Sequence, residues 1–340
     1  MNLLEYTIRR LIAMVGVILG VTLLTFTITR LIPADPVAIM MGEGYHDPAQ
    51  IAIIRRQLGL DQPLPVQYVF YLGRLILGNW GVSYHTGLPV LQDIQLYFGA
   101  TFQLTLVTLA LALVLGIPLG VISALKKDKW ADHITRITAL SGIAIPIFWL
   151  ALMMQLVFYS WLGILPYGGI VDDSLLYEHP VTTITGLIFI DTLLTGNWVV
   201  FLNALKHIIL PAAALGFRAV AWIMRMTRSS MIEVLRQDHI RTARAWGLPE
   251  RIVIYKRALK NSLIPILTTI GLTYGLLLQG SFLTEAIFNW PGMGLYAVNS
   301  IIYSDYPSIL GVSLTAALVY VTVNLVIDIL YCYADPRIRY

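Results

Sequence analysis

The chain has 340 residues, of which 57% are hydrophobic and 12% are charged, and its mean hydropathy is +0.74. These values lie outside the range of soluble globular proteins and predict a fold that buries apolar surface in lipid. The net charge of +4 does not indicate nucleic-acid binding, because no basic run with interleaved aromatic residues occurs outside residues 218–260, and a single cysteine excludes an internal disulfide.

Five long stretches of the chain contain no charged residue, and about 20 apolar residues are enough for a helix to cross a membrane. The stretches cover residues 11–29, 94–125, 137–171, 261–284 and 306–327. Each one predicts a transmembrane helix. A sixth candidate, residues 205–226, contains Lys206, Arg218 and Arg225 and is weaker on composition alone.

The distribution of basic residues decides whether this sixth segment crosses the membrane. Basic clusters occur at residues 9–10, 126–136, 218–260 and 337–339, and the third holds ten of the chain's 23 Lys and Arg residues. Lys and Arg near the ends of spans favour the cytoplasmic side, so all four clusters are expected inside. The chain must then cross an even number of times between the second and third clusters. We therefore predict an all-α, polytopic membrane protein with six transmembrane helices and both termini in the cytoplasm.

The first outer loop, residues 33–97, is too long and too apolar to be a simple connection. One short helix is expected at residues 48–58, capped by Asp47 and closed by Gly59. A second is expected at residues 65–77, lying at the membrane interface. The predicted division is a first transmembrane helix (1–32), an extracytoplasmic loop with short interfacial helices (33–97), and a five-helix core (98–340) that contains a cytoplasmic coupling loop (227–260).

The cytoplasmic loop carries the most informative pattern in the chain, Arg241-Thr-Ala-Arg-Ala-Trp-Gly247. A short helix ending at Gly247 is expected, because glycine can supply the left-handed turn that redirects the chain into the next helix. Arg241 and Arg244 can meet acidic groups of a cytosolic partner, and Ala243 and Ala245 permit close approach. The alternative is a basic loop held against anionic lipid headgroups.

This pattern resembles the cytoplasmic loop of the membrane subunits of ATP-binding cassette (ABC) importers, which has the form Glu-Ala-Ala, three residues, Gly, nine residues, Ile-x-Leu-Pro. Ala243, Gly247 and Leu259 match this form, whereas Arg241 and Thr242 depart from it. The departure is similar to the dipeptide, oligopeptide and nickel branch, where Arg-Thr-Ala-Arg-Ala-x-Gly-Leu is usual. The resemblance extends over the whole chain and includes residues 6–36, 225–231, 284–294 and 335–339.

The resemblance implies a type I importer permease in the cytoplasmic (inner) membrane of a bacterium or archaeon. It also implies a second, homologous permease, two ABC ATPase subunits that bind ATP and Mg, and an extracytoplasmic substrate-binding protein. Loop 238–248 is then expected to couple the ATPases to alternating-access transport of dipeptides or short oligopeptides. The residues assigned to coupling are Arg241, Thr242, Ala243, Arg244, Ala245, Gly247 and Leu259.

The composition of the chain gives no indication of enzyme activity. The chain has no Gly-Lys pair and hence no Gly-x-x-x-x-Gly-Lys-Ser/Thr loop to cradle phosphates. Its six histidines include no pair at i,i+4, so we expect no metal site and no cofactor on this chain. Besides its protein partners, the chain is expected to contact only membrane lipid.

Polar residues near the outer end of the fifth span are candidates for the translocation path. Tyr274 and Gln279 are expected to line it, because polar side chains within a span face the interior. Glu285 and Trp290 are expected to shape an outer gate, and anchoring of the Trp290 ring at the lipid interface is an equal alternative.

The sequence leaves alternative substrates and an alternative class of transporter possible. Nickel chelates, glutathione and oligosaccharides are handled by similar permeases, although the long outer loop at residues 161–203 looks more like the dipeptide type. An ion-coupled secondary carrier would need several carboxylates within its spans, and only Asp328 qualifies. A receptor or intramembrane enzyme would need a catalytic dyad, which the spans do not offer.

Overall fold

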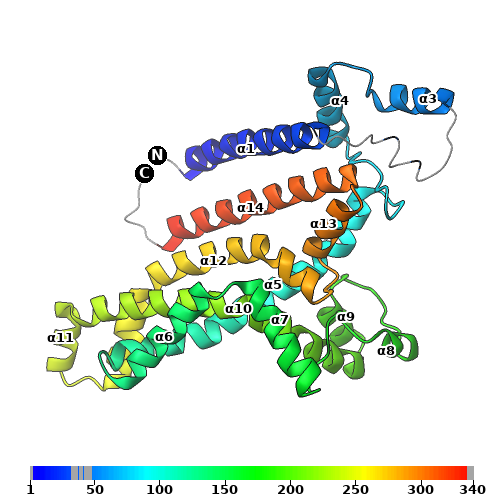
Figure 1. Cartoon of the computed structure of the whole chain (residues 1–340). Coiled ribbons are helices and arrows are strands. Elements are labelled where there is room, and N and C mark those ends of the chain that lie inside the picture. Colours follow the sequence, from blue (N-terminus) through cyan, green and yellow to red (C-terminus); the bar gives the residue numbers. More distant parts are fainter. Residues whose placement is uncertain (1–2, 32–36, 38–40, 42–47, 335–340) are drawn as a thin grey trace.

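The computed structural model describes residues 3–31, 37, 41 and 48–334, and this part of the chain consists of helices joined by loops, without a β-strand (Figure 1). The first half contains α1 (Leu3–Leu31), α3 (Pro48–Leu58), α4 (Leu64–Ile76), α5 (Val90–Leu125), α6 (Trp130–Ala144), α7 (Ile147–Met154) and the π-helix η1 (Gln155–Trp161). The second half contains α8 (Asp173–Glu178), α9 (Ile188–Leu194), α10 (Trp198–Leu235), α11 (Asp238–Ala245), the π-helix η2 (Ile252–Leu259), α12 (Lys260–Ile287), α13 (Met293–Ile302) and α14 (Tyr306–Ala334).

Five of the described helices are long and apolar enough to cross a membrane, and a bent pair makes a sixth span. The weakest candidate, residues 205–226, lies within α10, a helix of 38 residues. The prediction of six spans is therefore confirmed, with the bent pair counted as one.

The third span is not the uninterrupted helix that residues 137–171 predicted. α6 ends at Ala144, α7 begins at Ile147, and the two halves meet at an angle of 104°. Pro146 explains the break, because a proline lacks the N–H that would continue the hydrogen-bond ladder and forces the preceding residue into an extended conformation. Ile145 has that conformation, with φ −78° and ψ 126°. The apolar helix then ends at Trp161, earlier than predicted.

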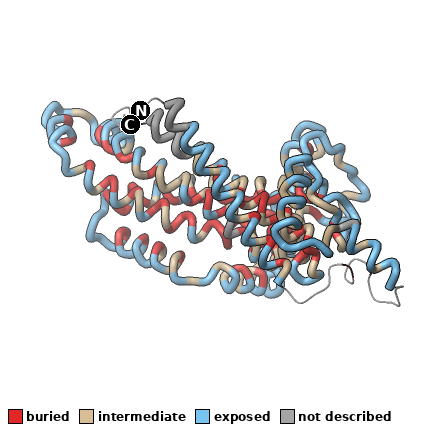
Figure 2. Tube along the Cα trace, turned by 90° about the horizontal axis from the view of Figure 1, so that it is seen from above, coloured by how far each residue is buried: buried red, intermediate tan, exposed pale blue. Residues whose placement is uncertain are grey.

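α10 is the central helix of the bundle and packs against α5, α6, α7, α9 and α12. Figure 2 shows the buried residues concentrated along these middle helices and exposed residues around them. Glycines permit the close approach of α5 and α10: a Cβ at Gly120 would lie 2.6 Å from the Cβ of Thr227. Small residues at helix contacts are the usual means of close packing within a membrane.

The two ends of the bundle differ in character (Figure 1). The start of α1, the end of α14 and the short helix α11 all lie at one end. The helices α3, α4, α8 and α9 lie at the other end. This arrangement agrees with the topology predicted from the basic residues, in which α11 is cytoplasmic.

The two short helices predicted in the first outer loop are present in the structure. α3 spans Pro48–Leu58, α4 spans Leu64–Ile76, and Gly59 and Gly78 follow them with φ values of +70° and +77°. The expected cap Asp47 and the motif segments 33–36 and 335–339 lie outside the described residues.

Hydrogen bonds fasten the outer loops to the bundle. Ser83 Oγ donates to Asp305 Oδ2 at 2.5 Å, which ties the first outer loop to the residue just before α14. Asn203 Nδ2 donates to Asp172 Oδ2 at 2.6 Å, and the side chain of Asn203 also accepts from the backbone amide of Asp172. The loop before α8 is therefore bound to the outer end of α10.

Candidate functional site

The cytoplasmic end of the bundle carries an elbow formed by α11 and the turn that follows it, residues 238–250. Asp238 lies in the first turn of α11, where a carboxylate interacts favourably with the helix dipole. The helix ends at Ala245, and Gly247 two residues later has a φ of +72°, in the left-handed region that favours glycine. Its amide donates to the carbonyl of Arg244 at 2.9 Å. Gly247 thus supplies the turn predicted from the sequence.

One face of the elbow is buried against the bundle. Ile240 and Ala243 expose 0% and 6% of their surface. They belong to a buried cluster whose other members are Val121, Ala124, Met231, Val234, Val253 and Ala258, with Leu259 packed against it. Helices α5, α10, α11 and η2 all contribute to this cluster, so a displacement of α11 is transmitted to three other helices.

The opposite face of the elbow is exposed. Its members are Arg241, Thr242, Arg244, Ala245 and Trp246. Trp246 is 77% exposed, which is unusual for a residue of this size and apolarity. Trp246 was not among the residues assigned to coupling from the sequence, although it lies directly before Gly247.

The seven residues assigned to coupling therefore divide into two groups. Arg241, Thr242, Arg244, Ala245 and the turn residue Gly247 are exposed, as a docking surface requires. Ala243 faces the bundle instead, so its small side chain permits close approach of α11 to its own core and not to a partner. Leu259 likewise contacts that core and holds η2 beneath the elbow.

An ion pair closes the turn of the elbow. Arg244 Nη2 donates to Glu250 Oε1 at 2.6 Å, and Arg244 Nε donates to Glu250 Oε2 at 3.3 Å. This hydrogen-bonded pair lowers the pKa of Glu250 below its usual value of 4.5 and raises the pKa of Arg244. A carboxylate whose pKa is lowered on folding stabilises the fold above its unfolded pKa, and this contribution is lost as the pH falls through the lowered value.

The elbow is therefore expected to keep this pair throughout the range from pH 6 to pH 8. Replacing Glu250 by glutamine should speed amide hydrogen exchange in residues 244–250 by no more than about fivefold, because exposed pairs contribute less than about 1 kcal/mol. Hydrogen exchange followed by mass spectrometry measures the change, with the intrinsic pH dependence of exchange removed. A pH-dependent difference between the two proteins within this range would contradict the assignment.

A buried ion pair lies behind the elbow, where α5, α6 and α10 meet. Arg228 donates from Nε to Asp132 Oδ1 at 2.6 Å and from Nη2 to Asp132 Oδ2 at 2.8 Å. Ser123 Oγ donates to the same carboxylate at 2.5 Å, as does the backbone amide of Asp128 at 3.0 Å. Asp132 is wholly buried, and the Arg228 side chain is 23% exposed. This pair was not predicted from the sequence because its members are 96 residues apart.

The predicted gate residues lie at the opposite end of the bundle, Glu285 in the last turn of α12 and Trp290 in the buried turn between α12 and α13. Trp290 is 0% exposed, and its Nε1 donates to the carbonyl of Ala100 in α5 at 2.9 Å. A wholly buried indole cannot anchor at a lipid interface, so that alternative is excluded by the position of the ring. Glu285 is also wholly buried and accepts from the backbone amide of Gly294 at 2.6 Å.

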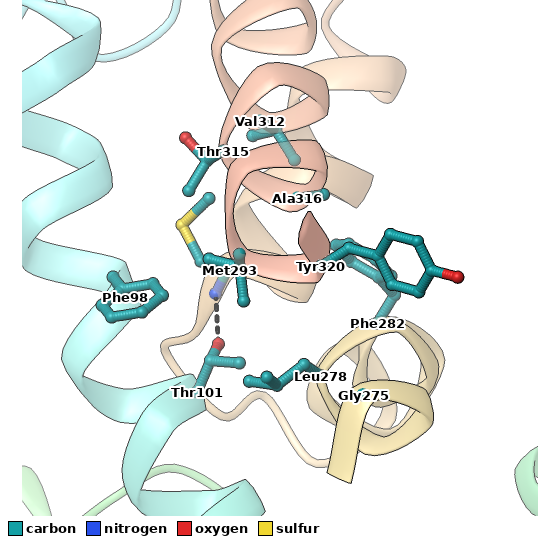
Figure 3. A pocket seen from close by; sticks show the side chains of 11 residues that line it. Phe98, Thr101, Gly275, Leu278, Phe282, Met293, Val312, Thr315, Ala316 and Tyr320 are labelled. Carbon is teal, nitrogen blue, oxygen red and sulfur yellow. Dashed lines mark hydrogen bonds between the residues drawn. The ribbon is translucent and has the colours of Figure 1, made fainter. Parts of the chain in front are cut away.

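Two glycines make this turn possible. A Cβ at Gly292 would collide with the Glu285 carboxylate, and a Cβ at Gly294 would collide with the Cα of Phe282. The neighbouring amide of Met293 donates to Thr101 Oγ1 at 2.8 Å (Figure 3). The turn is thus latched to α5 on one side and to α12 on the other.

A small apolar cavity of about 30 Å³ lies beside this latch, between α5, α12, α13 and α14 (Figure 3). Thr101, Phe282, Met293 and Tyr320 are among its lining residues. This volume is about that of one water molecule, so the cavity is a packing gap and not a passage. Of the two predicted path residues, Tyr274 is half-buried on α12, and the side chain of Gln279 lies outside the described residues.

Bacterial transport system permease proteins resemble the chain over nearly its full length. It is 47% identical to the probable D,D-dipeptide transport system permease protein DdpB of Escherichia coli, covering 97% of this chain and 96% of the relative. It is 44% identical to the dipeptide transport system permease protein DppB of Alkalihalophilus pseudofirmus, covering 99% and 100%. It is 36% identical to the glutathione transport system permease protein GsiC of Pectobacterium atrosepticum, covering 99% and 100%.

A solved structure supports the same fold. The inward-facing MetNI methionine ABC transporter contains a chain that matches with a TM-score of 0.50 and 16% sequence identity. The match covers 69% of this chain and 93% of the other. At this identity the match concerns the fold alone.

Two family profiles match almost the whole chain. One describes a binding-protein-dependent transport system inner membrane component and matches residues 116–340. Its N-terminal companion matches residues 3–105. The resemblance inferred from the cytoplasmic loop, the six-span helical fold and the inner-membrane location are thereby confirmed. The chain belongs to the family of binding-protein-dependent transport system inner membrane components, the multi-pass permease subunits of ABC importers.

Proposed function

We propose that this permease moves dipeptides or short oligopeptides into the cell, driven by two separate ABC ATPase subunits. The names of the relatives that are 44% and 47% identical over nearly the full length support the dipeptide cargo. Glutathione is the second candidate, supported by the relative at 36% identity. The partners are a second, homologous permease and an extracytoplasmic binding protein, and ATP with Mg binds to the ATPases, since this chain has no phosphate-cradling motif of its own.

The two-faced elbow is the observation that carries this proposal. Its inner face is built into the buried cluster of four helices, and its outer face exposes two arginines and Trp246. ATP binding closes the ATPase pair and displaces α11, and the displacement changes the access of the path between the paired permeases. The ATPases shift this equilibrium only by binding the two conformations with different affinity.

The coupling role predicts a large effect at Trp246. Truncating it to alanine should weaken binding of the ATPase subunits by about 30-fold, because a large aromatic anchor at an interface contributes about 2 kcal/mol. ATP-dependent uptake of dialanine into vesicles containing the reconstituted importer should fall in proportion. Both are measured on the complete complex, with its binding protein supplied.

Trp161→Ala is the matched control. Trp161 is 72% exposed and ends η1, on the outer side of the predicted topology, so its truncation should leave ATPase binding unchanged. Unchanged ATPase binding by Trp246→Ala would contradict the coupling surface. Dialanine uptake that follows a proton gradient and ignores ATP would contradict the importer and favour the ion-coupled carrier.

A further inference from the structure

A cavity of about 290 Å³ lies within the spanning region, where the break in the third span meets α10 and α12. Its lining residues are Ile147, Leu215, Arg218, Ala219, Trp222, Thr273, Leu276 and Leu277. Five of these are aliphatic, three carry hydrogen-bond donors, and none is acidic. Broken helices within a membrane are tolerated where they line such a cavity.

Arg218 is the charged group of this cavity. Its guanidinium lies 5.7 Å from the centre of the Trp222 ring. Within the described part of the chain it has neither an ion pair nor a hydrogen bond, and its side chain is exposed. An arginine in the middle of a span costs about 3 kcal/mol or more unless it faces water or a counter-charge. A position with such a cost indicates a function that needs the charge.

The other polar groups around Arg218 are donors without acceptors. Trp222 Nε1 and Thr273 Oγ1 are buried and have no hydrogen-bond partner, and Thr273 is only 3% exposed. Leaving such groups unsatisfied costs about 1–3 kcal/mol each, so they favour a conformation that supplies an acceptor.

The end of a helix adds to the positive character of the cavity. α7 begins at Ile147, which lines it, and the first turn of a helix has amides without intrahelical acceptors. Helix N-termini within broken spans favour anionic groups. Arginine, two free donors and a helix N-terminus therefore converge from α7, α10 and α12.

We infer that this cavity binds the terminal carboxylate of the transported peptide during its passage. Arg218 forms the ion pair, and small side-chain rotations bring Trp222 Nε1 and Thr273 Oγ1 to the carboxylate as donors. Leu215 and Leu276 contact the apolar side chain of the peptide. The volume is near the lower end of small-ligand pockets, about 300 Å³, which suits a short peptide. This inference rests on the proposed peptide cargo and assigns a path residue that the sequence analysis did not select.

The test uses the complete importer in lipid nanodiscs, without the binding protein, and follows tryptophan fluorescence. The signal of Trp222 is the difference between the native complex and its Trp222→Phe variant. Dialanine should change this signal saturably at millimolar concentration. Dialanine amide, which lacks the carboxylate, should need at least about tenfold more, because hydrogen bonds to charged groups contribute about 1.5–3 kcal/mol.

Variants of Arg218 distinguish binding of the peptide carboxylate from a general effect of positive charge on α10. Arg218→Gln should weaken the dialanine response at least about tenfold, and Arg218→Lys should restore most of it. Lys206→Gln is the matched control, since Lys206 is also an exposed cation on α10 but does not line the cavity. It should leave both the dialanine response and the ATPase activity unchanged.

Several results would overturn the inference. These are the absence of a saturable Trp222 signal, equal responses to dialanine and its amide, an unaffected Arg218→Gln variant, or an equal loss in Lys206→Gln. ATP-dependent uptake of dialanine by the native complex tests the proposed function separately. Uptake that proceeds while the acid and the amide bind equally would refute the carboxylate site alone, whereas failure of uptake would refute the peptide cargo.

Discussion

Replacing Asp132 by alanine is expected to destabilise the permease by about 3 kcal/mol, because it removes the carboxylate that accepts two hydrogen bonds from the partly buried Arg228, and a hydrogen bond to a charged group contributes about 1.5–3 kcal/mol. The lost contacts are the paired bonds of 2.6 and 2.8 Å from Arg228 and the bond of 2.5 Å from Ser123. These bonds hold α5, α6 and α10 together just before the chain enters the elbow. A lower midpoint of thermal unfolding in detergent, together with faster proteolysis at residues 236–250, measures the effect.

The double variant Asp132→Leu with Arg228→Met distinguishes the effect on stability of removing the whole ion pair from the effect of removing one partner. Replacing a buried ion pair by apolar residues of similar volume is often neutral or stabilising, so the double variant should unfold close to the native midpoint. If Asp132→Ala were as stable as the double variant, the unpaired guanidinium of Arg228 would not be costly on its own. The assignment of the pair as a structural clamp would then be wrong.

Substituting Gly294 by alanine should destabilise the latch between α12 and α13 by about 3 kcal/mol, the upper part of the range for overpacked cores. The new Cβ collides with the Cα of Phe282, which is backbone and cannot rotate away. It also displaces the amide that donates to the wholly buried Glu285 carboxylate. The expected result is loss of folded protein from the membrane, measured by fluorescence-detected size exclusion.

Gly275→Ala provides the matched control, at a glycine of α12 that faces α14. A Cβ at Gly275 meets only Val323 Cγ1, at 3.8 Å, which is an ordinary contact. Alanine is favoured over glycine inside a helix by about 1 kcal/mol, so this variant should be as stable as the native chain or more stable. Equal folding of the two variants would show that the turn at Gly294 adapts, and that the latch is not fixed by backbone contact.

Local features of the sequence were sufficient to predict much of the elbow and the outer loop. Gly59, Gly78 and Gly247 each end a helix in the left-handed conformation, which few other residues adopt without strain. The charge pattern placed α10 across the membrane although its composition did not. These predictions succeeded because the end of a helix and the asymmetry of charge around a span both depend on residues that are close together in the sequence.

Features that depend on contacts between distant segments could not be predicted in this way. The Asp132–Arg228 pair joins residues far apart in the chain, and neither residue stands out among the other charges near the inner face. Ala243 matched a family position, but only the packing of α11 shows that it faces the bundle. The break at Pro146 lies inside a stretch predicted as one helix, and its angle of 104° follows from the packing of two half-helices against α10.

α10 is a single helix from Trp198 to Leu235, which at 1.5 Å per residue gives a length of about 57 Å. Its outer end is bonded to the loop before α8 through Asn203, and its inner end contains Arg228 and contributes to the cluster beneath the elbow. Contacts on the two sides of the membrane therefore act on the same helix. Coupling between two binding sites is reciprocal: if ATPase binding changes the affinity for a ligand at the outer end by some factor, that ligand changes the affinity for the ATPases by the same factor.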